Sequence, residues 1–308
     1  MLRYALTRFL GAIPTLLILV TLAFFMIRAA PGGPFDSEKA LPPEIEANLR
    51  AAYHLDQPVW RQYLIYLGNL LQGDFGPSFR YKDFTVTELI AQGFPVSLEL
   101  GLWAIALAIA LGLPLGIVAA LHRNSSVDYL VMGTALAGVA IPNFVIAPIL
   151  ALVFGVLLAW LPVGGWNDGH WRNMVLPVVA LSIQQVAYIA RMTRASMIEV
   201  LGTHYIRTAR AKGLSEREVI WRHALRPALL PVVSYLGPAI AGIITGSVVI
   251  EQIFGIPGIG RYFVQAALNR DYTLVMGTVV FYGILIVLLN LIVDVLYSAL
   301  DPQIRYDD

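Results

Sequence analysis

The chain has no cysteine, and charged residues make up only 13% of its 308 residues. Without cysteine it has no disulfide, no thiolate nucleophile and no cysteine-ligated metal or iron–sulfur centre. No metal-ligand spacing relates the histidines, which are His54, His122, His170, His204 and His223. The phosphate-binding loop and the zinc-protease and serine-hydrolase motifs are also missing. We expect no catalysis, cofactor or metal in this chain, so that any ATP hydrolysis takes place on other polypeptides.

The sequence is instead rich in apolar residues. Hydrophobic residues make up 58% of the chain, and the mean hydropathy is +0.70. A soluble domain has no interior large enough for that much apolar surface, so the composition predicts an all-α polytopic membrane protein. The net charge of +1 gives no excess that would attract nucleic acid.

Uncharged runs predict six membrane-spanning helices, because one crossing needs about 20 residues. The expected helices cover residues 1–30 and about 98–122, 129–160, 173–200, 227–251 and 273–299. The third lies in a 39-residue uncharged run, Tyr129 to Asn167, which suits either one kinked helix or two helices joined by a tight turn. A signal-peptide cut after Ala30 would place Arg28 at the −3 position and Pro31 at +1, and both residues are poor for processing. The first helix is therefore expected to stay uncleaved.

The distribution of basic residues decides the topology. With six spans, one side carries twelve arginines and lysines, namely Arg3, Arg8, Arg123, Arg191, Arg194, Arg207, Arg210, Lys212, Arg217, Arg222, Arg226 and Arg305. The short loops opposite carry three, Arg172, Arg261 and Arg270. The positive-inside rule therefore places both termini, the tail 301–308 and the basic segment 204–226 in the cytoplasm. In this arrangement Pro142 and Pro148 kink a single third span within a transmembrane core of residues 95–300.

Residues 31–94 form the expected external segment. Pro42-Pro43 is typical of a helix start, and a second helix after Pro58 has an apolar stripe of Trp60, Tyr63, Leu64, Leu67 and Leu71. Thr85 and Glu88 have capping-box spacing and predict a short interfacial piece that ends at Pro95. The segment is either a lid on the outer helix ends or a contact for an external partner.

Few ionisable residues lie inside the spans. Glu99, Glu251 and Asp294 are near span ends, where snorkelling or structural pairing competes with a transport role. This scarcity argues against an ion-coupled carrier. Asn143, Gln184 and Gln185 are candidates for lining a path, and interhelical hydrogen bonding explains them equally well.

The basic segment His204 to Arg226 (HYIRTARAKGLSEREVIWRHALR) predicts a helix, a turn at Gly213 and a second helix capped by Ser215. One interpretation is a patch that holds orientation and touches anionic membrane lipid. Its interspersed alanines and aliphatic residues favour the other, a surface that docks into a groove of a partner.

Several stretches together resemble a known family. They are RFLGAIPTLLILVTLAFFMIRAAPG (8–32), LPPE (41–44), GDFGPSF (73–79), VAIPNFV (139–145), RMTRASMIEVL (191–201), TARAKGL (208–214), HALRPALLP (223–231), GSVVIEQIFGIPGIG (246–260) and ALNRDY (267–272). The whole chain resembles the peptide-importing ABC permeases, and most of all the first (B-type) membrane subunit of oligopeptide importers. Permeases for dipeptides, glutathione or nickel are the alternatives within the family, and an ion-coupled secondary transporter is the alternative outside it.

The resemblance implies a type I ABC importer permease fold in a bacterial inner membrane. Its implied partners are a second, similar permease subunit, two ATPases that bind ATP and Mg, and an external peptide-binding protein. It also implies that the segment couples to the ATPases through Thr208, Ala209, Ala211, Gly213 and Leu214, and that the translocation mouth lies near Glu251, Pro257, Gly258 and Gly260. Two positions depart from the family pattern, because Arg207 replaces an acidic residue and Pro227 comes one place late.

Overall fold

The computed structural model describes residues 2–29, 55–81 and 83–300. In these ranges the regular structure is helical, and the one strand-like feature is an isolated antiparallel bridge between Pro77 and Thr85. The predicted all-α class is therefore confirmed. The helix expected after Pro42-Pro43 lies outside the described residues.

Within the described ranges, four helices are long and apolar enough to cross a membrane unaided, namely α1 (Leu2–Ala29), α4 (Val86–Leu121), α7 (Trp171–Leu201) and α14 (Tyr272–Leu300). Two bent pairs also qualify. One joins α5 (Ser126–Ala140) to α6 (Asn143–Leu150) and the π-helical turn η1 (Ala151–Leu157), and the other joins α9 (Glu216–Glu218), η3 (Val219–Ala224) and α10 (Leu225–Ala228) to α11 (Leu230–Gly246). Six spans result if each pair counts as one crossing.

Helix α4 begins at Val86 rather than near residue 98 and continues past Pro95. The predicted capping box is present, because the Thr85 hydroxyl accepts from the Glu88 N–H at 3.2 Å and the Glu88 carboxylate accepts from the Thr85 N–H at 2.8 Å. No interfacial piece ends at Pro95. The buried face of α4 runs from Leu89 through Leu100 on both sides of the proline, so packing outweighs the backbone hydrogen bond that proline removes.

The third span is broken rather than gently kinked. Its two halves meet at an angle of 101°. Ile141 ends α5 in an extended conformation, as expected for a residue that precedes proline, and Pro142 then caps α6. Pro148, the other predicted kink, lies inside α6 without interrupting it.

The centre of the fold is the packing of α4 on α7. At Gly112 an added Cβ would lie 2.9 Å from the Ile189 side chain, and at Gly116 it would lie 2.5 Å from the Ala190 carbonyl oxygen. These glycines therefore let the two helices approach closely. A buried cluster that includes Leu100 and Leu176 extends this core toward α11.

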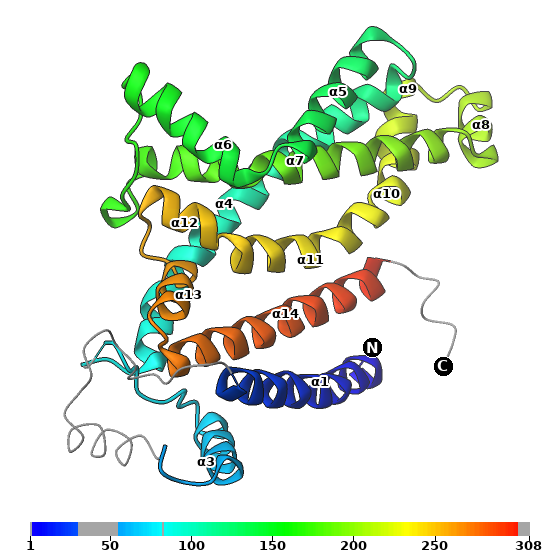
Figure 1. Ribbon diagram of the computed structural model, residues 1–308. Coiled ribbons are helices and arrows are strands. Elements are labelled where there is room, and N and C mark those ends of the chain that lie inside the picture. Colours follow the sequence, from blue (N-terminus) through cyan, green and yellow to red (C-terminus); the bar gives the residue numbers. More distant parts are fainter. Residues whose placement is uncertain (1, 30–54, 82, 301–308) are drawn as a thin grey trace.

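The predicted fifth span, residues 227–251, is divided into several pieces. Leu229 separates α10 from α11, and Ser247 separates α11 from α12 (Val248–Phe254). After α12, Gly255 adopts a left-handed φ of 65° and the chain turns into α13 (Ile259–Leu268). Pieces α12 and α13 pack against each other and against neighbouring helices rather than crossing the bundle (Figure 1).

Helix α3 (Val59–Leu71) lies beside the end of α1. Tyr63 makes the contact, because its hydroxyl is 2.7 Å from the Thr21 hydroxyl and its ring meets Phe24. Only part of the predicted apolar stripe packs, because Tyr63 makes this contact whereas Trp60 is 62% exposed and Leu71 is 89% exposed.

The start of α1 and the end of α14 lie at the same end of the bundle as α8 (His204–Ala211) (Figure 1). Helices α3 and α13 and the short η2 turn (Asn167–Gly169) lie toward the opposite end. This arrangement agrees with an even number of crossings.

Candidate functional site

The segment between α7 and α11 has the predicted helix–turn–helix form. Helix α8 ends at Ala211, Gly213 turns the chain, and Ser215 begins α9 by accepting the Glu218 N–H at 3.3 Å. We call residues 204–226 the coupling segment.

Gly213 has a φ of +79°, a conformation that side chains with a Cβ rarely adopt. No atom lies within 4 Å of the position that a Cβ would occupy there. Within the described part of the chain, the glycine therefore serves backbone conformation and not close packing.

Two ion pairs hold the turn. The Arg210 guanidinium bridges it by donating to both carboxylate oxygens of Glu216, at 2.7 and 3.1 Å. This hydrogen bonding raises the pKa of Arg210. Arg222 donates to Glu218 at 2.7 Å, one helical turn away. Some of the basic residues predicted to set orientation thus also fix the local shape.

The inner face of the coupling segment packs on the transmembrane helices. Ile206 and Ala209 are buried in a cluster with Met197 of α7, Ala120 of α4 and Val219. Leu214 packs on the edge of this cluster. Ala209, predicted as an ATPase contact, is therefore directed into this chain's own core, whereas Thr208, Ala211 and Gly213 are exposed. Of the predicted coupling residues, these three remain available to a partner.

Sequence reasoning missed two exposed aromatic residues here. Tyr205 is 47% exposed and Trp221 is 63% exposed. A recess beside Trp221 is lined also by Ser215, Arg217, Glu218 and Arg222. Tyr205 directly precedes buried Ile206, and Trp221 lies two positions after buried Val219. Helical spacing from those apolar positions was the available signal.

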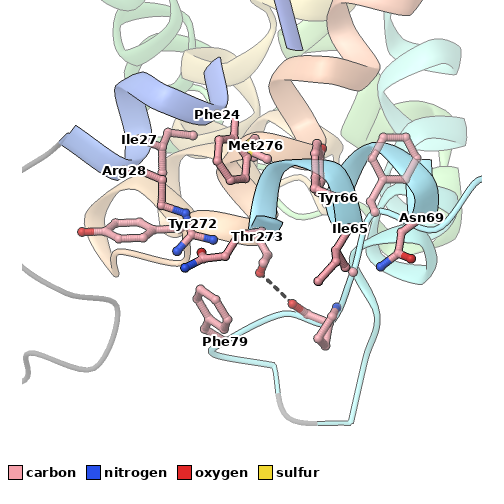
Figure 2. A pocket seen from close by; sticks show the side chains of 14 residues that line it. Phe24, Ile27, Arg28, Ile65, Tyr66, Asn69, Phe79, Tyr272, Thr273 and Met276 are labelled. Carbon is pink, nitrogen blue, oxygen red and sulfur yellow. Dashed lines mark hydrogen bonds between the residues drawn. The ribbon is translucent and has the colours of Figure 1, made fainter. Parts of the chain in front are cut away.

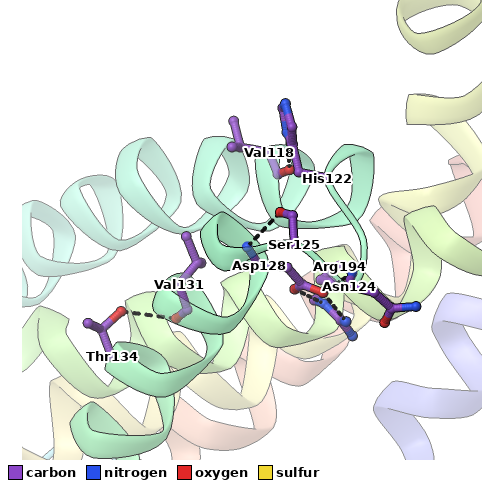
Figure 3. A network of polar contacts seen from close by, with 8 residues as sticks. All are labelled: Val118, His122, Asn124, Ser125, Asp128, Val131, Thr134 and Arg194. Atoms are coloured by element: carbon purple, nitrogen blue, oxygen red, sulfur yellow. Dashed lines mark hydrogen bonds and ion pairs between the residues drawn. The ribbon is translucent and has the colours of Figure 1, made fainter.

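A buried ion pair ties the start of α5 to α7 just before the coupling segment (Figure 3). The Arg194 guanidinium donates to both Asp128 oxygens, at 2.5 and 2.6 Å, and the Asn124 N–H donates to the same carboxylate at 2.9 Å. Ser125 caps α5 by accepting the backbone N–H of Asp128 at 3.4 Å. Arg194 was predicted only as an orientation signal, and its partner lies 66 residues away in sequence.

The path candidates do not form one cluster. Gln185 of α7 accepts a hydrogen bond from the Tyr235 hydroxyl of α11 at 2.6 Å, and the Tyr188 ring lies 5.9 Å from the Tyr235 ring. Gln184 is half-buried on the same helix. Asn143 follows the break at Pro142, and its buried Oδ1 atom has no hydrogen-bond partner in the part of the chain that the structure describes. Gln185 therefore joins two helices, as the packing interpretation expects.

The carboxylate of Glu251 joins three parts of the fold. It is fully buried and accepts from Ser97 at 2.7 Å, from Ser247, and from the backbone N–H of Gly260 at 2.8 Å. These bonds connect α4, α12 and the first turn of α13. Glu251 therefore has a structural role here, and its place near a translocation mouth stays a prediction.

The predicted glycines near Glu251 leave room for its carboxylate. A Cβ on Gly258 would lie 2.4 Å from the Glu251 carboxyl carbon, and one on Gly260 would lie 2.5 Å from the Val248 Cα. Pro257, between them and α12, is half-buried. Glu99 is exposed nearby, and the side chain of Asp294 lies outside the described part.

A second buried carboxylate was missed. Asp271 accepts from the Leu274 N–H at 3.1 Å, which caps α14, and from the Phe79 N–H at 3.2 Å. The Ser78 hydroxyl donates to it as well. Asp271 therefore anchors the external stretch 77–80 to α14, and its place in the ALNRDY stretch was the only sequence signal.

Comparisons with known proteins decide the family. A profile described as "Binding-protein-dependent transport system inner membrane component" matches residues 112–306, and the profile of the N-terminal part of that component matches residues 1–101. The chain belongs to this family. As such an inner membrane component, it is a multi-pass permease of a binding-protein-dependent transport system.

Curated relatives cover nearly the full chain. The oligopeptide transport system permease protein OppB of Salmonella typhimurium is 59% identical over 99% of this chain and 100% of its own length. The dipeptide transport system permease protein DppB of Bacillus subtilis is 46% identical over 99% of this chain and 98% of its own length. The predicted resemblance to oligopeptide permeases is confirmed.

Solved structures support the fold of this inner membrane component. An inward-facing structure of the MetNI methionine ABC transporter matches with a TM-score of 0.60 and 19% identity, over 69% of this chain and 96% of that chain. An amino acid ABC transporter crystallised with histidines matches with a TM-score of 0.53 and 18% identity, over 69% and 94%. The predicted ABC importer permease fold is confirmed at the level of the fold.

Proposed function

We propose that this chain is a permease subunit of an ATP-driven importer and translocates oligopeptides delivered by an external binding protein. The observation that carries the proposal is the 59% identity to an oligopeptide permease over the whole chain. Dipeptides are the second candidate substrate, because a dipeptide permease is 46% identical over the same span.

The proposed partners are a second homologous permease subunit, two ABC ATPases that bind ATP and Mg, and the peptide-binding protein. The translocation path forms with the second permease subunit. The termini and the coupling segment face the cytoplasm, where the basic residues of this segment agree with the positive-inside rule.

We propose that the coupling segment receives the movement of an ATPase and passes it to the bundle. Its exposed face offers Tyr205 and Trp221 to a partner, and its buried face packs Ile206 and Ala209 on α7 and α4. A displacement of this segment therefore moves the tightly packed α4–α7 pair with it. ATP binding supplies the bias between two states that transport needs.

Reconstitution tests the proposal. The complex containing this chain is purified from membranes, its subunits are identified, and it is placed in liposomes with ATP enclosed. We expect ATP-dependent uptake of labelled peptides longer than dipeptides, dependent on the binding protein. Uptake without ATPases, or uptake of dipeptides alone, would contradict the oligopeptide proposal.

A further inference from the structure

A pocket lies between α1, α3 and α14 at the end of the bundle opposite α8, and neither the coupling segment nor the Glu251 network reaches it (Figure 2). The volume of this pocket is about 190 Å³. Its lining combines aromatic side chains with polar ones, among them Arg28, Gln62, Tyr66 and Asn69.

Arg28 brings a positive charge into this pocket. It is near the end of α1, a helix on which several apolar side chains are exposed, for example Leu22 at 57% and Met26 at 71%. The Arg28 side chain is half-buried, with its guanidinium carbon 5.2 Å from the centre of the Phe24 ring, and it extends toward Tyr272 and Thr273 (Figure 2). In residues 2–29, 55–81 and 83–300, no carboxylate lies within ion-pair distance of it. An arginine without an anionic partner would be expected to extend outward to the membrane surface. Because Arg28 instead extends into the pocket, we expect an anion to bind beside it.

Two neutral groups in the pocket also lack hydrogen-bond partners among residues 2–29, 55–81 and 83–300. Gln62 is only 8% exposed, and its amide nitrogen donates to the Gln57 carbonyl at 2.7 Å, which leaves the Oε1 atom fixed and without a donor. The buried Tyr66 hydroxyl has no partner either. Burial raises the pKa of Tyr66, so its phenol stays protonated and able to donate. Buried polar atoms without partners are rare and point to a bound molecule.

The three groups together define the chemistry of the occupant. Arg28 and the Tyr66 hydroxyl suit the oxygens of a phosphate, and Gln62 Oε1 suits a hydroxyl or ammonium donor. Water would satisfy Gln62 and Tyr66 but would not neutralise Arg28. A phosphate and a hydroxyl or ammonium group occur together in phospholipid headgroups, and the apolar surface of α1 beside the pocket suits the acyl chains.

We propose that the pocket between α1, α3 and α14 binds the phosphate-bearing headgroup of a membrane phospholipid. The lipid thereby joins α1 to the external helix α3 and to the start of α14.

Native mass spectrometry of the purified complex tests this proposal with palmitoyl-oleoyl phosphatidylglycerol as the probe and the matching diacylglycerol, which lacks phosphate, as the comparison. We expect Arg28→Gln to weaken the binding of the most tightly bound phosphatidylglycerol molecule about tenfold or more, because charge-assisted hydrogen bonds to its phosphate are lost. Tyr66→Phe, which keeps the ring, should weaken it less. Arg61→Gln removes an equal charge from the exposed start of α3 and should leave binding unchanged.

The results separate the sources of phosphate. Unchanged lipid binding in both Arg28→Gln and Tyr66→Phe would overturn the proposal, as would equally tight binding of the diacylglycerol. Displacement of the lipid by millimolar inorganic phosphate alone would also overturn it, because the site would then be one for a soluble anion. If Arg28→Gln does not assemble, Tyr66→Phe decides, because removing an unpartnered hydroxyl does not itself destabilise the fold.

Discussion

Gly213 turns the chain between α8 and α9 with a φ of +79°, and the space around its missing side chain is open in the described part. A glycine here has two separate uses, one in the backbone and one in fitting against a partner. They make different demands on a replacement, because asparagine tolerates a left-handed conformation better than alanine does but is larger.

We expect Gly213→Ala to reduce ATP hydrolysis stimulated by peptide-loaded binding protein, because a left-handed alanine costs about 1–2 kcal/mol. Gly213→Asn should retain more of the stimulation than Gly213→Ala if the backbone sets the requirement. Gly202→Ala, at a φ of −81°, is the matched control and should change little. Greater damage from asparagine than from alanine, with the protein still in the membrane, would show that a partner fills the space.

Glu251 gives the second prediction at this scale. Glu251→Gln keeps the size but places an amide N–H₂ group among four donors, so it should destabilise the purified complex by about 1–3 kcal/mol. Thermal unfolding of the complex measures this. Exposed Glu99→Gln is the control, and an equal effect from both variants would contradict the buried role of Glu251.

Sequence reasoning at single residues succeeded where the rule is local. The capping box at Thr85 and Glu88 was predicted because both partners lie within one helical turn. The burial of Ala209 and Glu251 was not predicted, because it depends on which neighbouring helix each side chain meets.

At the scale of elements, α4 and α7 form the rigid centre that the coupling segment contacts. The positions of the prolines alone did not predict where the helices break. Pro95 and Pro148 lie within continuous helices, whereas Pro142 coincides with a bend of 101°. The difference lies in packing, since α4 keeps one buried face across Pro95 and so does not need to end there.

The Asp128–Arg194 pair fixes the position of α5 on α7. Asp128→Ala should lower the thermal midpoint of the complex by several degrees and speed protease cleavage in the α4–α5 turn, residues 122–125, because it leaves the half-buried Arg194 guanidinium without its ion-pair partner. Arg191→Gln, an exposed neighbour on α7, is the control. Additive effects of Asp128→Ala and Arg194→Ala in the double variant would contradict a direct pair.

Trp221 is the strongest candidate for anchoring the ATPase, because exposed tryptophans often dominate interfaces. Trp221→Ala should weaken ATPase binding by about 2 kcal/mol or more, which is roughly 30-fold, measured by co-purification at graded salt and detergent. Trp171→Ala, 65% exposed at the other end of α7, should bind the ATPase normally. Equal loss in both variants would point to general destabilisation.

At the scale of the whole molecule, composition and charge were sufficient to predict an all-α polytopic membrane protein, because hydropathy and positive charge act on whole helices and loops. They were not sufficient to predict the broken fifth span or the buried hydrogen-bond networks. Ser97 and Glu251 are 154 positions apart, and Ser78 and Asp271 are 193 apart, so these networks follow from the fold.

We expect the coupling segment, α4 and α7 to move as one body relative to α1. Because the chain has no cysteine, spin labels on two introduced cysteines report distances in this subunit without removal of native thiols. One label is placed at Lys212 of the coupling segment, and the second either at exposed Leu102 of α4 or at exposed Ile18 of α1.

The decisive measurement is the change in these two distances, by pulsed electron paramagnetic resonance on the assembled complex, when ATP analogue and loaded binding protein are added. The Lys212–Leu102 distance is predicted to stay constant while the Lys212–Ile18 distance changes. A Lys212–Leu102 distance that changes while the Lys212–Ile18 distance stays constant would contradict this prediction.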